Sequence, residues 1–166
     1  MLQPVVRRTW APRGQTPIHR SWDRRDRLSG ISAISVSPRC RQLGLYFDLH
    51  DHNIDSHTFE RFVRWLRQRL RRPLILVLDR WQVHRSAVRR LVDRFGRSLV
   101  IDWLPPYAPE LNPVEQVWSH TKYGDLANYI PEDVATLADE VLASIHRTAS
   151  SQSLLRAFFK HAELEL

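Results

Sequence analysis

The stretch that decides the fold of this chain reads LILVLD (residues 74–79), RWQVHRSA (80–87) and, after a helix-like segment, LPPYAPELNPVEQVW (104–118). Asp79 directly follows a short apolar run, and Glu115 stands near the start of a predicted helix, just after a proline-rich turn. Hard divalent cations prefer carboxylate oxygens that are rigidly held. We therefore predict that Asp79 and Glu115 belong to a divalent-metal site, although the third carboxylate that such sites normally have does not stand where it is expected.

Apolar periodicity predicts the elements on either side of this stretch. The predicted strands span residues 30–36, 43–49, 74–78 and 99–104, and the run 74–78 is expected to be buried on both faces. The predicted helices span residues 56–70 and 154–159, with one more opened by Asn112-Pro113 and a long one after Pro131. Residues 1–28 are predicted to form a turn-rich entry punctuated by Pro12, Gly14 and Pro17.

A further helix is predicted between the two apolar runs 74–78 and 99–104. Ser86 is expected to cap it and Gly96 to end it, with an apolar stripe facing inward that consists of Val88, Leu91, Val92 and Phe95. Strands followed by a strand–helix alternation indicate a single α/β domain over residues 1–166, with a mixed sheet flanked by helices. In such sheets the functional crevice lies at the carboxyl ends of the strands, where Asp79 stands.

Composition narrows the class of protein further. The chain of 166 residues has one cysteine, Cys40, so no internal disulfide is possible and a reducing, cytoplasmic setting is the simplest expectation. No apolar run approaches the roughly 18 residues of a membrane span, and the N-terminus lacks the apolar core of a signal peptide. We therefore expect no association with a membrane.

The net charge of +7 is unevenly spread along the chain. Residues 1–100 hold 21 Arg and no Lys against 8 acids, a balance of 21 − 8 = +13, whereas residues 101–166 hold 4 basic residues against 10 acids, a balance of −6. A basic half of this strength favours a polyanionic partner, and nucleic acid is the common one. The alternative is that the arginines only keep the surface hydrated and bind no polyanionic partner.

Each candidate residue also has a structural interpretation. Asp79 could be an ordinary strand-end aspartate, and Glu115 could pair with Asn112 in a capping box. His84 alone would more often be a packed or solvated histidine, and Trp118 is more often a core residue than a platform for a base. A polar cluster that includes a His-x-His pair lacks the spacing of a structural zinc site; it consists of Asp48, His50, Asp51, His52 and His57.

Two quoted stretches resemble a known family. LILVLDRWQVHRSA (74–87) and LPPYAPELNPVEQVWSHTK (104–122) are similar to the catalytic domain of DDE transposases, in particular the bacterial insertion-sequence branch related to mariner elements. RTWAPRGQTP (8–17), DRRDRLSGISAI (23–34) and TFERFVRWL (58–66) resemble earlier segments of the same family, so the likeness covers nearly the whole chain. Asp79 and Glu115 are 115 − 79 = 36 positions apart, which suits the second and third acids of the family.

The resemblance implies a ribonuclease H-like fold and two Mg²⁺ (or Mn²⁺) ions held by three acids, with Asp79 and Glu115 as two of these catalytic ligands. It implies DNA strand cleavage and strand transfer, with one ion activating the attacking oxygen and the other stabilising the leaving oxygen. The expected partners are insertion-sequence ends and target DNA in the bacterial cytoplasm, associated with the nucleoid, and the active form is expected to be a homo-oligomer. The candidate DNA-contacting residues are Arg61, Arg64, His84, Arg85 and Lys122.

Three departures from the family shape these expectations. The first acid of the family lies on a strand before the segment that matches RTWAP, and no Asp or Glu precedes Asp23 here. The N-terminal helix-turn-helix region of the family has no match in this chain. Arg80 stands where the family commonly has Asn. We therefore expect a domain truncated at its N-terminus, without the first strand, and inactive alone unless an upstream-frame product supplies the acid. Asp48 or Asp51 is a candidate replacement for that acid.

Two other interpretations remain open. The chain could be a non-catalytic DNA-binding fragment that modulates a full-length transposase. It could also be a different ribonuclease H-like nuclease, such as a resolvase.

Overall fold

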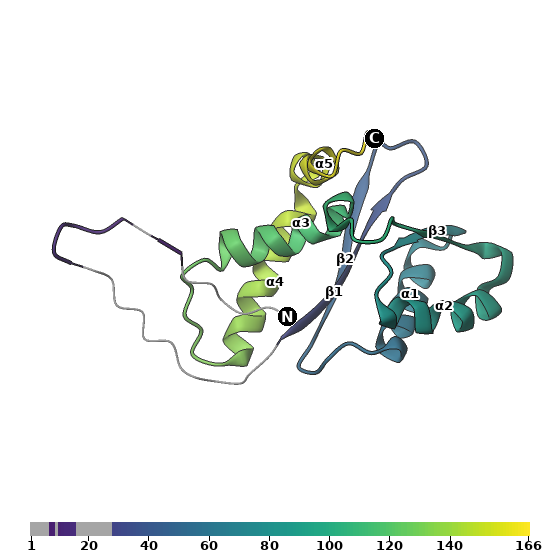
Figure 1. The fold of residues 1–166 in the computed structure, drawn as a ribbon, viewed down its shortest axis with the longest axis horizontal. Coiled ribbons are helices and arrows are strands. Elements are labelled where there is room, and N and C mark those ends of the chain that lie inside the picture. Colours follow the sequence, from purple (N-terminus) through teal and green to yellow (C-terminus); the bar gives the residue numbers. More distant parts are fainter. Residues whose placement is uncertain (1–6, 9, 16–27) are drawn as a thin grey trace.

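The computed structural model describes residues 7–8, 10–15 and 28–166, and it is a mixed α/β structure in which two small sheets are flanked by helices (Figure 1). The strands are β1 (Ser29–Val36), β2 (Leu43–His50), β3 (Leu74–Leu78) and β4 (Leu99–Trp103). The α-helices are α1 (Ser56–Leu70), α2 (Gln82–Phe95), α3 (Pro113–His120), α4 (Val134–Ser150) and α5 (Gln152–His161). A short π-helical turn, Thr121–Asp125, extends α3.

The two sheets have opposite strand arrangements. β1 and β2 form an antiparallel hairpin whose register runs from Ser29↔His50 to Val36↔Leu43. β3 and β4 are parallel, from Leu74↔Leu99 to Leu78↔Trp103, and α2 forms the crossover between them. Among the described residues β1 is not hydrogen-bonded to β3, so each sheet has two strands.

The helices divide between the two sheets. In Figure 1, α1 and α2 lie beside β3, whereas α3, α4 and α5 lie on the other side of the hairpin. The first side is packed around Phe62, Val63 and Leu91, and the second around Val117, Val141 and Leu155, all of them buried. The hairpin therefore stands between two groups of helices, and α3 is brought against β1.

Helix α1 shows how local sequence sets these elements. The Asp55 carboxylate accepts a hydrogen bond from the Thr58 amide at 2.7 Å and satisfies a free donor in the first turn. Phe59, Phe62, Val63 and Leu66 repeat at helical spacing and are buried. The helix ends at Arg71, which adopts the left-handed conformation with φ of 53°. The predicted bounds of 56–70 are confirmed.

Most predicted elements form where they were expected, within a few residues. The strands start or end within one residue of the predicted bounds, Asn112 caps α3 with Pro113 in its first turn, and Gly96 ends α2. The turn expected at Pro12 and Gly14 is present, with the Gln15 amide donating to the Pro12 carbonyl at 3.0 Å. Pro17 lies outside the described residues.

The predicted burial of β3 on both faces is wrong. Leu74, Leu76 and Leu78 pack toward α1 and α2, but Ile75 is 73% exposed and Val77 is 54% exposed. In β4, which was also expected to be buried, Val100 is 54% exposed. The reason is that the helices of this part of the chain cover one face of the β3–β4 sheet, and no described helix covers the other.

The predicted cap of α2 is also wrong. The helix begins at Gln82, and the Ser86 hydroxyl lies inside it, donating to the Gln82 carbonyl at 2.8 Å. Of the stripe expected to face inward, Leu91 is fully buried but Val92 is exposed. No helix of the described ranges is long and apolar enough to cross a membrane.

Candidate active site

Asp79 is the first residue after β3 and is held by two hydrogen bonds. Its Oδ1 atom accepts from the Trp81 amide at 3.0 Å and from Nδ1 of His84 at 2.7 Å. The His84 hydrogen bond, aided by the Trp81 amide, holds the pKa of Asp79 below its usual value against the opposing effect of burial. Asp79 is therefore an ionised carboxylate of fixed orientation at neutral pH.

His84 is mostly buried beneath this carboxylate. Its ring centroid lies 4.4 Å from that of Phe59 and 5.3 Å from that of Trp81, so α1 and α2 together fix the imidazole. Because a carboxylate only accepts hydrogen bonds, Nδ1 of His84 is the donor. The structure thus places His84, predicted as a DNA-contacting residue, against Asp79. In this position His84 can hold the Asp79 carboxylate in place.

Glu115 lies in the first turn of α3, whose start is defined by Asn112 and Pro113. The Asn112 side chain accepts from the Val114 amide at 3.2 Å, and its carbonyl accepts from the Glu115 amide at 3.0 Å. The Asn112 amide itself donates to the Pro109 carbonyl at 3.0 Å, so it is not available for the capping-box pairing with the Glu115 side chain. Among the described residues no hydrogen bond engages the Glu115 carboxylate.

Asp79 and Glu115 line the same cleft, a space of about 930 Å³. Partial burial, followed by the negative charge of Asp79, raises the pKa of Glu115. The two carboxylates are therefore close enough to repel each other, although they come from different elements. Two hard oxygen donors with mutual repulsion suit a divalent cation, which would relieve that repulsion.

Trp118, one turn beyond Glu115, anchors α3 across β1. Its indole ring lies directly over Gly30: a Cβ atom at position 30 would lie 2.8 Å from Cζ2 and Cζ3 of the indole. The ring also packs against the buried cluster that includes Leu126 and Val141. Trp118 is therefore a packing residue, as expected, and the absence of a side chain at Gly30 lets α3 approach β1 and present Glu115 to the cleft.

The candidate replacements for a third acid are not part of this cleft. Asp48 pairs with His50 at 3.2 Å and Asp51 with His52 at 2.8 Å, on and just after β2, and neither carboxylate lines the space that holds Asp79 and Glu115. Within the described ranges no three His, Cys, Asp or Glu side chains form a metal-binding group. The residues described here thus supply two carboxylates.

The predicted basic DNA contacts are spread over the surface. Arg61 and Arg64 lie on α1, where Arg61 is exposed and donates to the Thr58 hydroxyl at 3.4 Å. Arg85 is exposed and lies on α2, directly after His84. Lys122 lies in the π-helical turn, with its ammonium 5.1 Å from the Tyr123 ring centroid.

Trp81 was not among the predicted site residues. It lines the cleft, is about half exposed, and contacts His84 through its ring while its amide donates to Asp79. Its spacing from Asp79, two residues along the chain, was the signal: an aspartate side chain often accepts from the amide two residues later.

The geometry defines a class: a mixed α/β domain that places a strand-end aspartate and a helix-start glutamate in one cleft. Comparison with known proteins then identifies the family. The sequence profile described as "DDE superfamily endonuclease" matches residues 1–137, and the chain belongs to that family. No curated protein matches the chain by sequence search.

A solved structure shares the fold. The crystal structure of the Mos1 strand transfer complex matches with a TM-score of 0.58 at 14% sequence identity, over 98% of this chain and 47% of the matched one. The chain thus has the ribonuclease H-like type of fold and spans about half the length of the relative that it matches.

Proposed function

We propose that this chain is the metal-binding part of the catalytic domain of an insertion-sequence transposase, which cleaves DNA strands and joins them to target DNA. The observation that carries the proposal is the convergence of Asp79 and Glu115 in one cleft, with the pKa of Glu115 raised by burial and by the charge of Asp79. Membership of the DDE endonuclease family supports the reaction type.

The two carboxylates fit Mg²⁺ or Mn²⁺. Asp79 would offer its free oxygen, because Oδ1 is occupied by His84 and Trp81, and Glu115 would offer both of its oxygens. Two divalent ions, when bound, would activate the attacking water or 3′-hydroxyl and stabilise the charge of the leaving oxygen. His84 keeps the Asp79 carboxylate ionised and oriented, and the Asn112 cap and the Trp118 anchor hold Glu115 on α3.

Two carboxylates leave the metal site incomplete. We expect activity to require a third carboxylate from outside the described residues, because these supply only two to the cleft. Loss of one ligand is severe in phosphoryl transfer, because catalysis depends on positioning and on stabilisation of charge.

DNA is the proposed substrate. Candidate DNA-contacting residues lie on α1 (Arg61 and Arg64), on α2 (Arg85) and in the π-helical turn (Lys122), and residues 1–100 carry the excess of positive charge. This positive charge would attract the phosphates of element ends and target DNA. A homo-oligomeric active form and a location at the bacterial nucleoid follow from the same proposal.

The test combines the chain with the polypeptide encoded immediately upstream of its Met1 codon. With Mg²⁺ or Mn²⁺ we expect nicking of DNA that carries the element ends, abolished by Asp79→Asn and by Glu115→Gln. Glu110→Gln is the matched control, since Glu110 precedes α3 and does not line the cleft. Cleavage that survives both site substitutions would refute the assignment of the metal ligands.

Other outcomes identify the competing functions. Salt-sensitive DNA binding that needs no metal and survives both substitutions, without cleavage, would favour a DNA-binding fragment that modulates a transposase. Cleavage of branched DNA but not of linear element ends would favour a resolvase.

A further inference from the structure

Helices α1 and α2 carry most of the positive charge of this chain. Each has four arginines against one acidic residue, a balance of 4 − 1 = +3, so together they hold +6, whereas the whole chain has a net charge of +7. The two helices contact each other and lie beside β3 (Figure 1). The basic half of the sequence thus folds into a basic layer over one face of the β3–β4 sheet.

Most of this charge has no carboxylate partner. Among the described residues, Arg90 is the only arginine of the two helices in an ion pair, and its Nε atom donates to the Glu60 carboxylate at 2.8 Å. This pair joins α1 to α2 and neutralises the one acid of α1. Like charges that crowd on one surface favour the approach of a polyanion. The other arginines of the layer are therefore suited to an anionic partner.

Trp65 places an exposed indole within the basic surface of α1. It is 45% exposed, and Arg61 and Arg69, four residues before and after it, are exposed on the same side of the helix. The indole meets Tyr46 of β2 in a T-shaped contact, with the ring centroids 5.9 Å apart, and its centroid lies 5.8 Å from that of Phe62. These contacts fix the ring on one side and leave the rest of it open to solvent.

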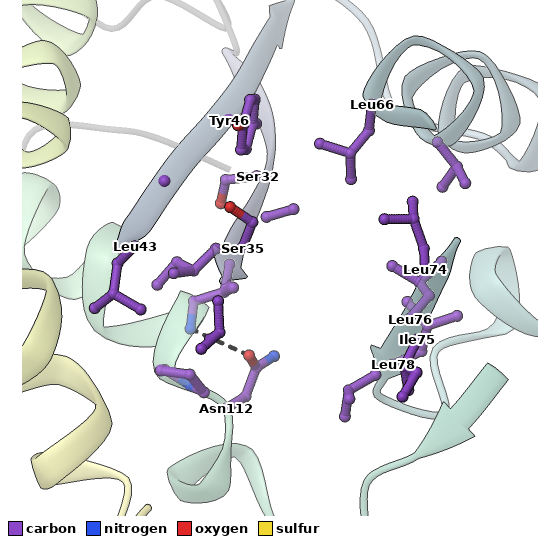
Figure 2. Close-up of a pocket in the computed structure, with 18 of the residues that line it drawn as sticks. Ser32, Ser35, Leu43, Tyr46, Leu66, Leu74, Ile75, Leu76, Leu78 and Asn112 are labelled. Carbon is purple, nitrogen blue, oxygen red and sulfur yellow. Dashed lines mark hydrogen bonds between the residues drawn. The ribbon is translucent and has the colours of Figure 1, made fainter. Parts of the chain in front are cut away.

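The indole stands outside the cleft that holds the two carboxylates. Leu66, the next residue of α1, projects toward the strand that carries Tyr46, and both of these residues line the cleft (Figure 2). Trp65 does not line the cleft, although its ring contacts Tyr46. The basic surface of α1 therefore begins at the rim of the cleft and is separate from the carboxylates.

We propose that this face of α1 binds single-stranded nucleic acid, with Arg61 and Arg69 on phosphates and the Trp65 indole stacked on an unpaired base. Single-stranded nucleic acid is bound where cations follow the phosphates and an aromatic ring accepts the face of a base. A duplex keeps its base faces inside the stack, so it can engage the arginines but not the indole. This binding needs neither a metal ion nor the two carboxylates, so it goes beyond the proposed function.

The first test measures the contribution of the indole. A labelled oligothymidylate of about twelve nucleotides is titrated in EDTA and followed by fluorescence anisotropy. Trp65→Leu should raise its dissociation constant at least about fivefold, the lower end of what stacking on one base contributes. Trp65→Phe keeps a ring and should stay within about twofold of the parent. Trp10→Leu is the matched control, because it removes a fully exposed indole outside the two helices.

The second test separates stacking from charge. Arg61→Ala and Arg69→Ala should each weaken binding and reduce the slope of log K against log salt by about 0.7, the value for one phosphate contact of a single strand. Trp65→Leu should weaken binding and leave that slope unchanged. Arg39→Ala is the charge-matched control, since Arg39 is exposed in the turn between β1 and β2 and should change neither quantity.

The third test removes the bases from the probe. A strand of abasic nucleotides of the same length keeps the phosphates, so it should bind the parent weakly, and Trp65→Leu should bind it no worse than the parent does. Glu115→Gln should bind oligothymidylate as the parent does, which separates a failure of this proposal from a failure of the metal site. Circular dichroism and thermal unfolding confirm that each variant is folded.

Three results would overturn the proposal. An equal loss for Trp65→Leu with oligothymidylate and with the abasic strand, or with a duplex of the same length, would exclude base stacking. A loss with Arg39→Ala as large as that with Arg69→Ala would reduce the binding to net charge. Salt-sensitive self-association that Arg69→Ala abolishes would make the acidic residues 101–166 of a second copy the occupant of this face.

Discussion

Replacing Gly30 by alanine tests how α3 is positioned. An added Cβ would overlap with Cη2 of the Trp118 indole and lie 2.8 Å from Cζ2 and Cζ3, so something must shift. The indole cannot easily retreat, because it packs against the buried cluster of Leu126 and Val141. Overpacking of this type costs about 1–3 kcal/mol. The smaller conformational freedom of alanine in the unfolded chain returns about 0.4–1 kcal/mol.

The expected net loss for Gly30→Ala is therefore about 1–2 kcal/mol, from an overpacking cost of about 2 kcal/mol less the gain in the unfolded chain. Tm should fall by about 2–8 °C for a chain of this size. Urea unfolding followed by circular dichroism measures the loss. Gly124→Ala is the control, since its added Cβ would meet no atom closer than 3.8 Å.

A double-mutant cycle isolates the contact. Trp118→Phe removes the ring atoms that face position 30, so Gly30→Ala should cost at least 0.5 kcal/mol less in that background. Gly30→Ala should also weaken Mn²⁺ binding, because α3 carries Glu115 away from the cleft. A Gly30→Ala chain as stable as the parent, with no coupling to Trp118, would refute the anchoring of α3 described above.

Three further predictions concern charge and packing. Above pH 7, without divalent ions, Glu115→Gln should be more stable than the parent, because the raised pKa of Glu115 means that its ionised form opposes folding beside Asp79. The difference in urea midpoints should vanish as the pH falls through the unfolded-state pKa of Glu115. Mn²⁺ should stabilise only the parent. The pKa of Glu60 is lowered mainly by its 2.8 Å hydrogen bond to Arg90, so above its unfolded-state pKa the ionised carboxylate stabilises the contact between α1 and α2. Glu60→Gln should lower the free energy of unfolding by about 0.5–1 kcal/mol at pH 7, and this loss should disappear below the lowered folded-state pKa. A loss that persists in acid would exclude the ion pair as its source. Leu91→Ala should lower the free energy of unfolding by about 3–5 kcal/mol, since this side chain is fully buried; a loss below about 1 kcal/mol in denaturant titration would contradict the core assignment.

The bounds of helices and strands with a regular apolar repeat could be predicted from the sequence to within a few residues. Helix α1 combines an apolar stripe with a clear stop, so its bounds are found without tertiary information. The cap by Asn112 and the proline after it locate the start of α3, and hence Glu115. The two metal-site candidates could be selected because both stand at element ends, and the structure places them in one cleft.

Features that depend on distant parts of the chain could not be predicted. The run 74–78 shows that β3 is apolar, but periodicity does not reveal whether a helix covers its second face, so it does not predict the exposure of Ile75 and Val77. The start of α2 carries polar residues that hide its periodicity, so the sequence predicts the cap at Ser86 and not before Gln82. The contact of His84 with Asp79 requires α2 to begin early and turn back on β3.

The flanks of β3 have a consequence for the behaviour of the free chain in solution. An apolar strand with an open edge is a template for intermolecular β-pairing. Here Arg71, Arg72 and Pro73 precede the strand, and Asp79 and Arg80 follow it. Charges and proline in these positions act as gatekeepers against aggregation. Asp79→Asn would remove one of them, so increased aggregation of that variant must be separated from any loss of the proposed metal binding.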